Sequence, residues 1–150
     1  MTRISAFGIS ATLPDHWEAR IFRHEGGEPT LHAATFPLPP SDGEFGSRAT
    51  QRMPAGGLFL SLTEYRIGEG IEVTGGLFGN PMPRTLAGEH FSSRSLLQAR
   101  AGQRGLQRFF SDAGRAFCLY VVVADGAAQG RRLEAVSDVL SSLDIRPERV

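Results

Sequence analysis

Apolar and polar residues alternate over several short stretches in the first third of the chain, a pattern typical of half-buried β-strands. Residues 4–14 mix β-branched and apolar positions and end at a proline, so they predict one strand. Residues 18–24 and 30–38 predict two more strands. Gly26 and Gly27 lie between these two and tolerate the positive φ of a short connection, so the pair is expected to form a hairpin.

The middle of the chain combines one clear strand with irregular segments. Residues 58–68 carry leucine at every second position of their first half, which predicts a strand with one buried face. Residues 39–57 and 80–93 are rich in Pro, Gly and Ser and predict long loops, of which the first is long enough to indicate a functional or mobile segment. The remaining features are two short edge strands expected at 71–73 and 77–79, and a stretch, 95–102, that fits a helix or a strand.

The most apolar run of the chain predicts a central strand. Residues 105–110 and 115–124 flank a turn in which Asp112 and Gly114 are favoured residue types, so they predict a second hairpin. The second of these strands has apolar side chains at both odd and even positions. That composition is typical of a strand covered on both faces.

One segment near the end of the sequence has the periodicity of a helix. Its apolar positions fall on one helical face: Leu133, Val136, Val139, Leu140 and Leu143. Pro147 prevents the helix from continuing far beyond them. Mostly antiparallel strands followed by one helix predict a single α+β domain over residues 1–150, with the C-terminal amphipathic helix packed on one face of the sheet.

Two short motifs at the ends of this pattern resemble a known group. The first predicted strand ends in "LPDHW", with Leu13, Pro14 and Trp17, and the helix closes in "VLSSLDI", with Ser142 and Leu143. The combination is similar to the PsbP-like α/β/α sandwich group, and it covers the two ends of the chain but not its middle. The resemblance implies a fold and a binding or assembly module without catalytic residues of its own. It carries over no site residue.

Composition and charge exclude several classes of function. The formal net charge is zero, so no global field favours duplex nucleic acid. All 16 basic residues are Arg. Without Lys, a P-loop and Schiff-base or pyridoxal chemistry are excluded within this chain. There is no signal-peptide pattern and no apolar run long enough for a membrane span, so a soluble, cytoplasmic protein is expected.

Cysteine and histidine offer little chemistry. Cys118 lies in the middle of the most apolar run, where a packing role is expected rather than that of a nucleophile. If Phe22 pairs with His32, His24 and His32 would share one face of the first hairpin, but the spacing of a metal site is absent. His90 or His32 would be the base if the protein were a small hydrolase-like enzyme, which is the third hypothesis. No catalytic residue, metal ligand or cofactor is assigned.

Arginines are concentrated in residues 91–111, a segment that contains no acidic residue. Arg100, Arg104 and Arg108 recur every four residues, and on a helix or on strands they would share a face. Guanidinium groups in such an arrangement suit phosphate or carboxylate, so these residues are candidate ligands for a small anion. The alternative is that acidic residues from other segments complete solvated ion pairs with them, and Glu134, Asp138 and Asp144 are available.

Phenylalanines in the Gly- and Pro-rich segments are candidates for protein binding. Phe45, Phe59 and Phe78 would anchor an interface if exposed, or would fold back onto the sheet as lids of the core. The first hypothesis is therefore a non-catalytic protein-binding or assembly module, with a homodimer through a sheet edge also possible. The second is a domain that binds a small anionic ligand through its Arg-rich face.

Overall fold

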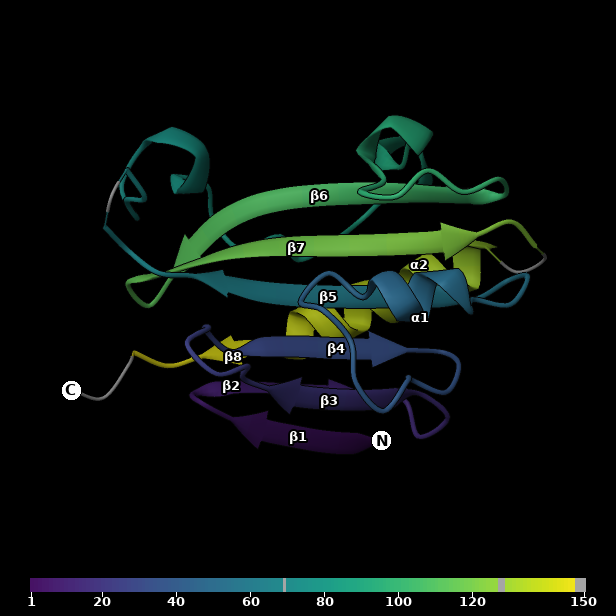
Figure 1. Cartoon of the computed structure of the whole chain (residues 1–150), viewed down its shortest axis with the longest axis horizontal. Helices are drawn as coiled ribbons and strands as arrows, with labels where there is room; N and C mark the ends of the chain where they lie inside the picture. The colour runs from purple at the N-terminus through teal and green to yellow at the C-terminus, as the bar shows by residue number, and fades with distance from the viewer. Residues whose placement is uncertain (69, 127–128, 148–150) are drawn as a thin grey trace.

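The computed structural model describes residues 1–68, 70–126 and 129–147. Its largest element is a five-stranded antiparallel sheet in the order β3–β4–β5–β7–β6 (Figure 1). The strands are β3 (Glu18–Phe22), β4 (Thr30–Ala34), β5 (Leu58–Tyr65), β6 (Gln103–Asp112) and β7 (Arg115–Ala124). Both predicted hairpins are confirmed. All ten residues of β7 are buried, and the strand lies between β5 and β6, as its two apolar faces indicate.

A smaller sheet, β1–β2–β8, joins the start of the chain to residues near its end. Its strands are β1 (Thr2–Ala6), β2 (Ile9–Leu13) and β8 (Asp144–Ile145). The single strand predicted for residues 4–14 was wrong, because the chain reverses at Phe7 and Gly8, whose φ angles are 53° and 76°. Ala6 pairs with Ile9 across this two-residue turn. The apolar positions change phase at the turn, from even-numbered residues before it to odd-numbered residues after it, and the single-strand prediction missed this change.

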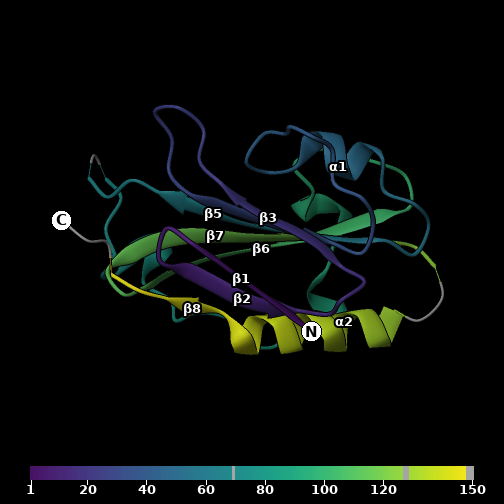
Figure 2. The same cartoon turned by 90° about the horizontal axis from the view of Figure 1, so that it is seen from below.

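Helix α2 (Gln129–Ser142) lies on one face of the large sheet, beside the smaller sheet (Figure 2). The apolar face expected for this helix is buried against the leucines of β5 and the inner residues of β2. Ser142 links the end of the helix to β2, because its hydroxyl accepts a hydrogen bond from the backbone N–H of Thr12 at 2.9 Å. The predicted α+β architecture with a C-terminal helix on one face is confirmed. No helix in the described part of the chain is long and apolar enough to cross a membrane.

The opposite face of the large sheet is covered by the loop predicted at 39–57, which contains a short helix, α1 (Ser47–Gln51) (Figure 2). Asp42 fixes the start of α1: its two carboxylate oxygens accept the N–H groups of Arg48 and Ala49 at 3.0 and 2.9 Å. The carbonyl of Glu44 accepts hydrogen bonds from side chains of β4 and β5. The loop is thus fastened onto the sheet by specific polar contacts.

The outer edge of β6 is covered by irregular chain. Ser92 exchanges two backbone hydrogen bonds of 2.9 Å with Gly105, and Asn80 accepts the N–H of Ser111 at 3.1 Å. The edge strands predicted at 71–73 and 77–79 were wrong. Gly68 and Ile71 form an isolated β-bridge. The chain then forms short 3-10 helices: η1 (Gly76–Phe78), η2 (Gly88–His90) and η3 (Ser93–Ser95). Beyond η3, residues 96–102 form neither a helix nor a strand.

Candidate functional site

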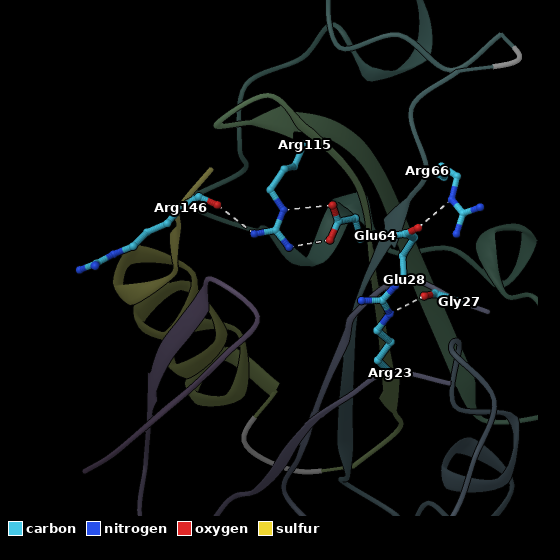
Figure 3. Close-up of polar contacts among 7 residues, drawn as sticks. All are labelled: Arg23, Gly27, Glu28, Glu64, Arg66, Arg115 and Arg146. Carbon is cyan, nitrogen blue, oxygen red and sulfur yellow. Dashed lines mark hydrogen bonds and ion pairs between the residues drawn. The ribbon is translucent and has the colours of Figure 1, made fainter. Parts of the chain in front are cut away.

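A buried ion pair stands at one end of the core (Figure 3). Arg115 donates to the carboxylate of Glu64 through Nε at 3.0 Å and through Nη2 at 2.6 Å, and both side chains are about 95% or more buried. Glu64 follows the row of leucines on the inner face of β5, and Arg115 precedes the inner face of β7. The pair therefore closes the apolar core with two opposite charges.

Arg115 also ties three distant segments together. Its Nη1 donates to the carbonyl of Arg146 at 2.9 Å, and the N–H of Arg146 donates to the carbonyl of Gly8 at 2.8 Å. A Cβ atom on Gly8 would lie 2.8 Å from Arg115 Nη1 and 3.2 Å from the Arg146 carbonyl. The turn between β1 and β2 is thus seated directly against β7 and the residues that follow β8.

Next to this junction lies an open hollow of about 780 Å³. It is bordered by the β1–β2 hairpin, the connection between β3 and β4, and the residues after β8. Its charged lining residues are Arg3, Arg23, Arg146 and Glu28, and this space is called the Arg-lined hollow below. Its other lining residues are Ser5, Phe7, Gly8, Ser10, Pro29 and Pro147.

The positive charge of the hollow is only partly compensated. Arg3 donates to the hydroxyls of Ser10 and Thr12, and Arg23 donates to the carbonyl of Gly27, so both bind neutral acceptors. Among the described residues, neither arginine forms an ion pair.

Arg146 and Glu28 complete the charges that line the hollow. Arg146 is 3.6 Å from Asp144, and this contact is largely exposed. Glu28, the one carboxylate among the described lining residues, is paired with Arg66 at 2.9 Å (Figure 3). The hollow thus presents cationic groups with hydrogen-bonding capacity left for a ligand.

A second hollow, of about 410 Å³, adjoins the first and shares Glu28 and Pro147 with it. It is lined by the ion pair itself and by Tyr65 and Arg66. Burial raises the pKa of the Tyr65 hydroxyl, so this group is a neutral hydrogen-bond donor at neutral pH. The two hollows together make this end of the molecule a polar concave surface.

The arginines singled out from the sequence do not form one face. Arg104 and Arg108 lie on edge strand β6, on the same side as the buried Leu106. Arg100 precedes the strand, donates to Gln98 at 2.9 Å and lies close to Tyr120, whose side chain is on the other side of the sheet. The expectation of one shared face is therefore wrong, because the connection before β6 carries Arg100 across the sheet.

Two of the three phenylalanines predicted as protein-binding anchors are buried. Phe59 lies in the core under α1, and Phe78 packs against Tyr65 and Phe109. Phe45 is half-buried and meets Tyr120 edge-on, with ring centroids 6.1 Å apart. Phe45 and Phe78 pack onto the sheet, the alternative that the sequence left open, whereas Phe59 belongs to β5 and is covered by α1. Phe59 and Phe78 are not exposed to a partner in this conformation.

His24, His32 and Cys118 make contacts that stabilise the fold. Burial lowers the pKa of His32, whose Nε2 lies 2.7 Å from the Glu44 carbonyl, and His24 Nε2 lies 2.9 Å from the carbonyl of Asp42. His32 pairs with Arg20 rather than with Phe22, although the Phe22 ring contacts both imidazoles edge-on.

His90 is exposed and accepts a long bond, 3.4 Å, from the N–H of Ala87. Burial raises the pKa of Cys118 to about 12, so its thiol is not ionised at neutral pH. In residues 1–68, 70–126 and 129–147, no three potential ligands gather around a metal position.

The residues of the Arg-lined hollow were not found from the sequence. Arg3, Arg23 and Arg146 are far apart along the chain, and each stands in a stretch of unremarkable local charge. The pairing of β2 with β8 brings Arg3 and Arg146 to one place, and the connection between β3 and β4 adds Arg23. A partial signal was present in Glu64, which continues the inward-facing row of leucines in β5 and so required a buried cationic partner.

No protein-family model matches this chain, and no curated protein or solved structure is significantly similar to it. The resemblance to the PsbP-like group, carried by Leu13, Pro14, Trp17, Ser142 and Leu143, therefore stays a prediction.

Proposed function

We propose that this protein is a binding domain for a small organic anion, held in the Arg-lined hollow. One observation carries the proposal: three arginines from three distant segments line a single hollow of about 780 Å³ that has one carboxylate among its described lining residues, and that carboxylate is already paired. The proposal keeps a ligand class expected from the sequence and assigns it to Arg3, Arg23 and Arg146 instead of Arg100, Arg104 and Arg108.

The chemistry of these side chains supports an anionic ligand. A guanidinium group presents several N–H donors in a plane and matches the oxygens of phosphate or carboxylate in pairs. Ser5 and Ser10 add hydroxyl groups to the lining. Because the arginines are exposed, each is expected to add only about 0.5–1 kcal/mol, and the affinity is expected to fall with added salt.

The size of the hollow also argues for an organic ligand over a bare inorganic ion. Its volume lies in the range of roughly 300–1,000 Å³ typical of small-molecule sites. In Figure 3 the guanidinium groups of Arg23 and Arg146 stand well apart, on either side of the β1–β2 hairpin. A ligand that reaches both must be extended or carry more than one anionic group.

Calorimetric titration with pyrophosphate at low ionic strength tests the proposal. Arg23→Gln and Arg146→Gln are each expected to weaken binding about two- to fivefold, the equivalent of roughly 0.5–1 kcal/mol. Arg94→Gln removes the same charge from an exposed position on η3, away from the hollow, and is the matched control. The proposal fails if neither pyrophosphate nor ribose 5-phosphate binds, or if Arg94→Gln weakens binding as much as the other two changes.

Protein binding or assembly is the second candidate, and one feature of the smaller sheet favours it. β1 forms the outer edge of this sheet, and its residues Thr2, Arg3 and Ser5 are exposed. An edge strand offers backbone groups to which another strand can pair. Light scattering over a range of protein concentrations tests the homodimeric form of this proposal, since a monomer at every concentration would contradict it.

A further inference from the structure

Phe7 is an unusual residue at the rim of the Arg-lined hollow. It occupies the first position of the two-residue turn between β1 and β2, with a φ of 53°, and 49% of its surface is exposed. A turn of this kind requires positive φ at both central residues and favours Asn-Gly or Gly-Gly. A bulky side chain is disfavoured there.

The fold does not require a ring at this position. The β6–β7 hairpin uses the same left-handed pair of residues, Ala113 and Gly114, with φ angles of 53° and 75° and only a methyl side chain at the first position. Phe7 gains little from packing, because half of it faces solvent. An exposed aromatic ring held in a disfavoured backbone conformation points to a role outside folding.

The turn that carries Phe7 is held rigidly. Gly8 is seated against Arg115 and the carbonyl of Arg146, so the backbone on which Phe7 stands is fixed by the buried ion pair. Phe7 lines the same hollow as Arg3, Arg23 and Arg146. A ligand in the hollow would therefore meet guanidinium groups and one flat apolar face.

We propose that the organic anion is a nucleotide, whose base stacks on Phe7 while its phosphate is held by the arginines of the hollow. This inference rests on the proposed function and adds the ligand class to it. Nucleoside phosphates combine a flat heteroaromatic ring with more than one negative charge, the two features that Phe7 and the three arginines select. The same chemistry is present in a free mononucleotide and at the end of a single strand.

Calorimetry with a series of probes tests phosphate binding and base stacking separately. Ribose 5-phosphate reports on the anion site alone, and AMP adds the base. AMP is expected to bind at least about fivefold more tightly than ribose 5-phosphate, the lower end of the range for one stacked base.

Substitutions at Phe7 decide whether this residue causes the difference. Phe7→Asn, which suits the turn better than phenylalanine, is expected to raise the melting temperature and to remove the advantage of AMP over ribose 5-phosphate. Phe7→Tyr keeps a flat ring at the same place and is expected to retain the advantage.

The outcomes distinguish the two proposals. Equal affinities for AMP and ribose 5-phosphate, or an AMP advantage that survives Phe7→Asn, would overturn the nucleotide inference while leaving the anion site intact. If neither AMP nor ribose 5-phosphate binds, the proposed anion-binding function fails together with the nucleotide inference. A short oligothymidylate that binds more tightly than TMP, with the same dependence on Phe7, would support a strand end as the source, and equal binding would support the free nucleotide.

Discussion

Arg115 and Glu64 form a two-point ion pair inside the protein, with nitrogen–oxygen distances of 2.6 and 3.0 Å. Removing two charges from water is costly, and the cost is offset only where geometry and further hydrogen bonds are good. Here the remaining Nη1 of Arg115 donates to the Arg146 carbonyl, and the guanidinium lies 5.5 Å from the centre of the Phe117 ring. The pair thus links the end of the core to the border of the Arg-lined hollow.

Breaking this pair is expected to destabilise the protein strongly. Arg115→Leu leaves the Glu64 carboxylate buried without its partner, and a loss of about 3–5 kcal/mol in the free energy of unfolding is expected, measured by urea denaturation. Replacing both residues by leucine should recover part of this loss, because no lone charge remains. Arg66→Leu, which breaks the exposed pair with Glu28, is the control and should cost at most about 1 kcal/mol. A loss of stability in Arg115→Leu as small as that in Arg66→Leu would contradict the prediction.

The close approach of Gly8 to Arg115 gives a second prediction. Gly8 and Gly26 have nearly the same φ, 76° and 75°, but a Cβ on Gly26 would meet nothing within 4 Å, whereas one on Gly8 would lie 2.8 Å from Arg115 Nη1. Gly8→Ala is therefore expected to cost at least about 1 kcal/mol more than Gly26→Ala, as forced packing does. Urea denaturation of the two variants measures the difference, and equal costs would show that the contact with Arg115 is easily relaxed.

Stability is expected to depend on pH through His32. Burial lowers the pKa of this imidazole below its ordinary value of 6.5, and its neutral ring can donate from Nε2 to the Glu44 carbonyl. Well above pH 6.5 the ring is neutral in both states and its contribution is complete. As pH falls below 6.5, the unfolded chain takes up a proton that the folded protein does not, so stability is lost progressively until the lower folded pKa is reached.

Denaturation midpoints between pH 8 and pH 5 measure this dependence. His32→Gln should be less stable at pH 8 and should lose less stability on acidification than the wild type. His90→Gln removes an exposed imidazole and is the matched control. An unchanged slope in His32→Gln would show that another group causes the loss.

Cys118 is expected to be unreactive in the folded protein. Its thiol is buried at the centre of β7, and its pKa is raised to about 12, so almost no thiolate forms at neutral pH. A chromogenic disulfide reagent at pH 8 should label the thiol only after the protein unfolds. Labelling of the native protein within minutes, at a rate similar to that of the denatured protein, would contradict the buried position.

The elements that the sequence predicted correctly are those whose pattern is set by neighbouring residues. The apolar face at Leu133, Val136 and Leu140 determines one side of α2, and the run from Phe117 to Val123 fits only a covered strand. In both cases the apolar spacing reports burial directly. The break at Phe7 and Gly8 was missed because it lacks the Asn-Gly or Asp-Gly signal of such turns, although the apolar positions change phase there.

The candidate site depends on contacts between residues distant in sequence, which local patterns do not report. Arg3 and Arg146 reach the same hollow because β2 pairs with β8, and that short strand has no distinctive pattern. Arg100, Arg104 and Arg108 had the clearer local signal, but a regular spacing in sequence gives a shared face only within one continuous element. The inward position of Glu64 was the one feature from which a buried partner could have been inferred.

The pairing of Ile9 with Ile145 also has a consequence for how the chain folds during synthesis. Strand β2 is synthesised before every strand of the large sheet, whereas the helix and the strand that cover Ile9, Ala11 and Leu13 follow the last of those strands. Until then this apolar strip lacks the part of its cover that α2 and β8 supply, and contacts so far apart in sequence form slowly. The inner face of β2 is therefore expected to stay incompletely covered during synthesis until both α2 and β8 have been made.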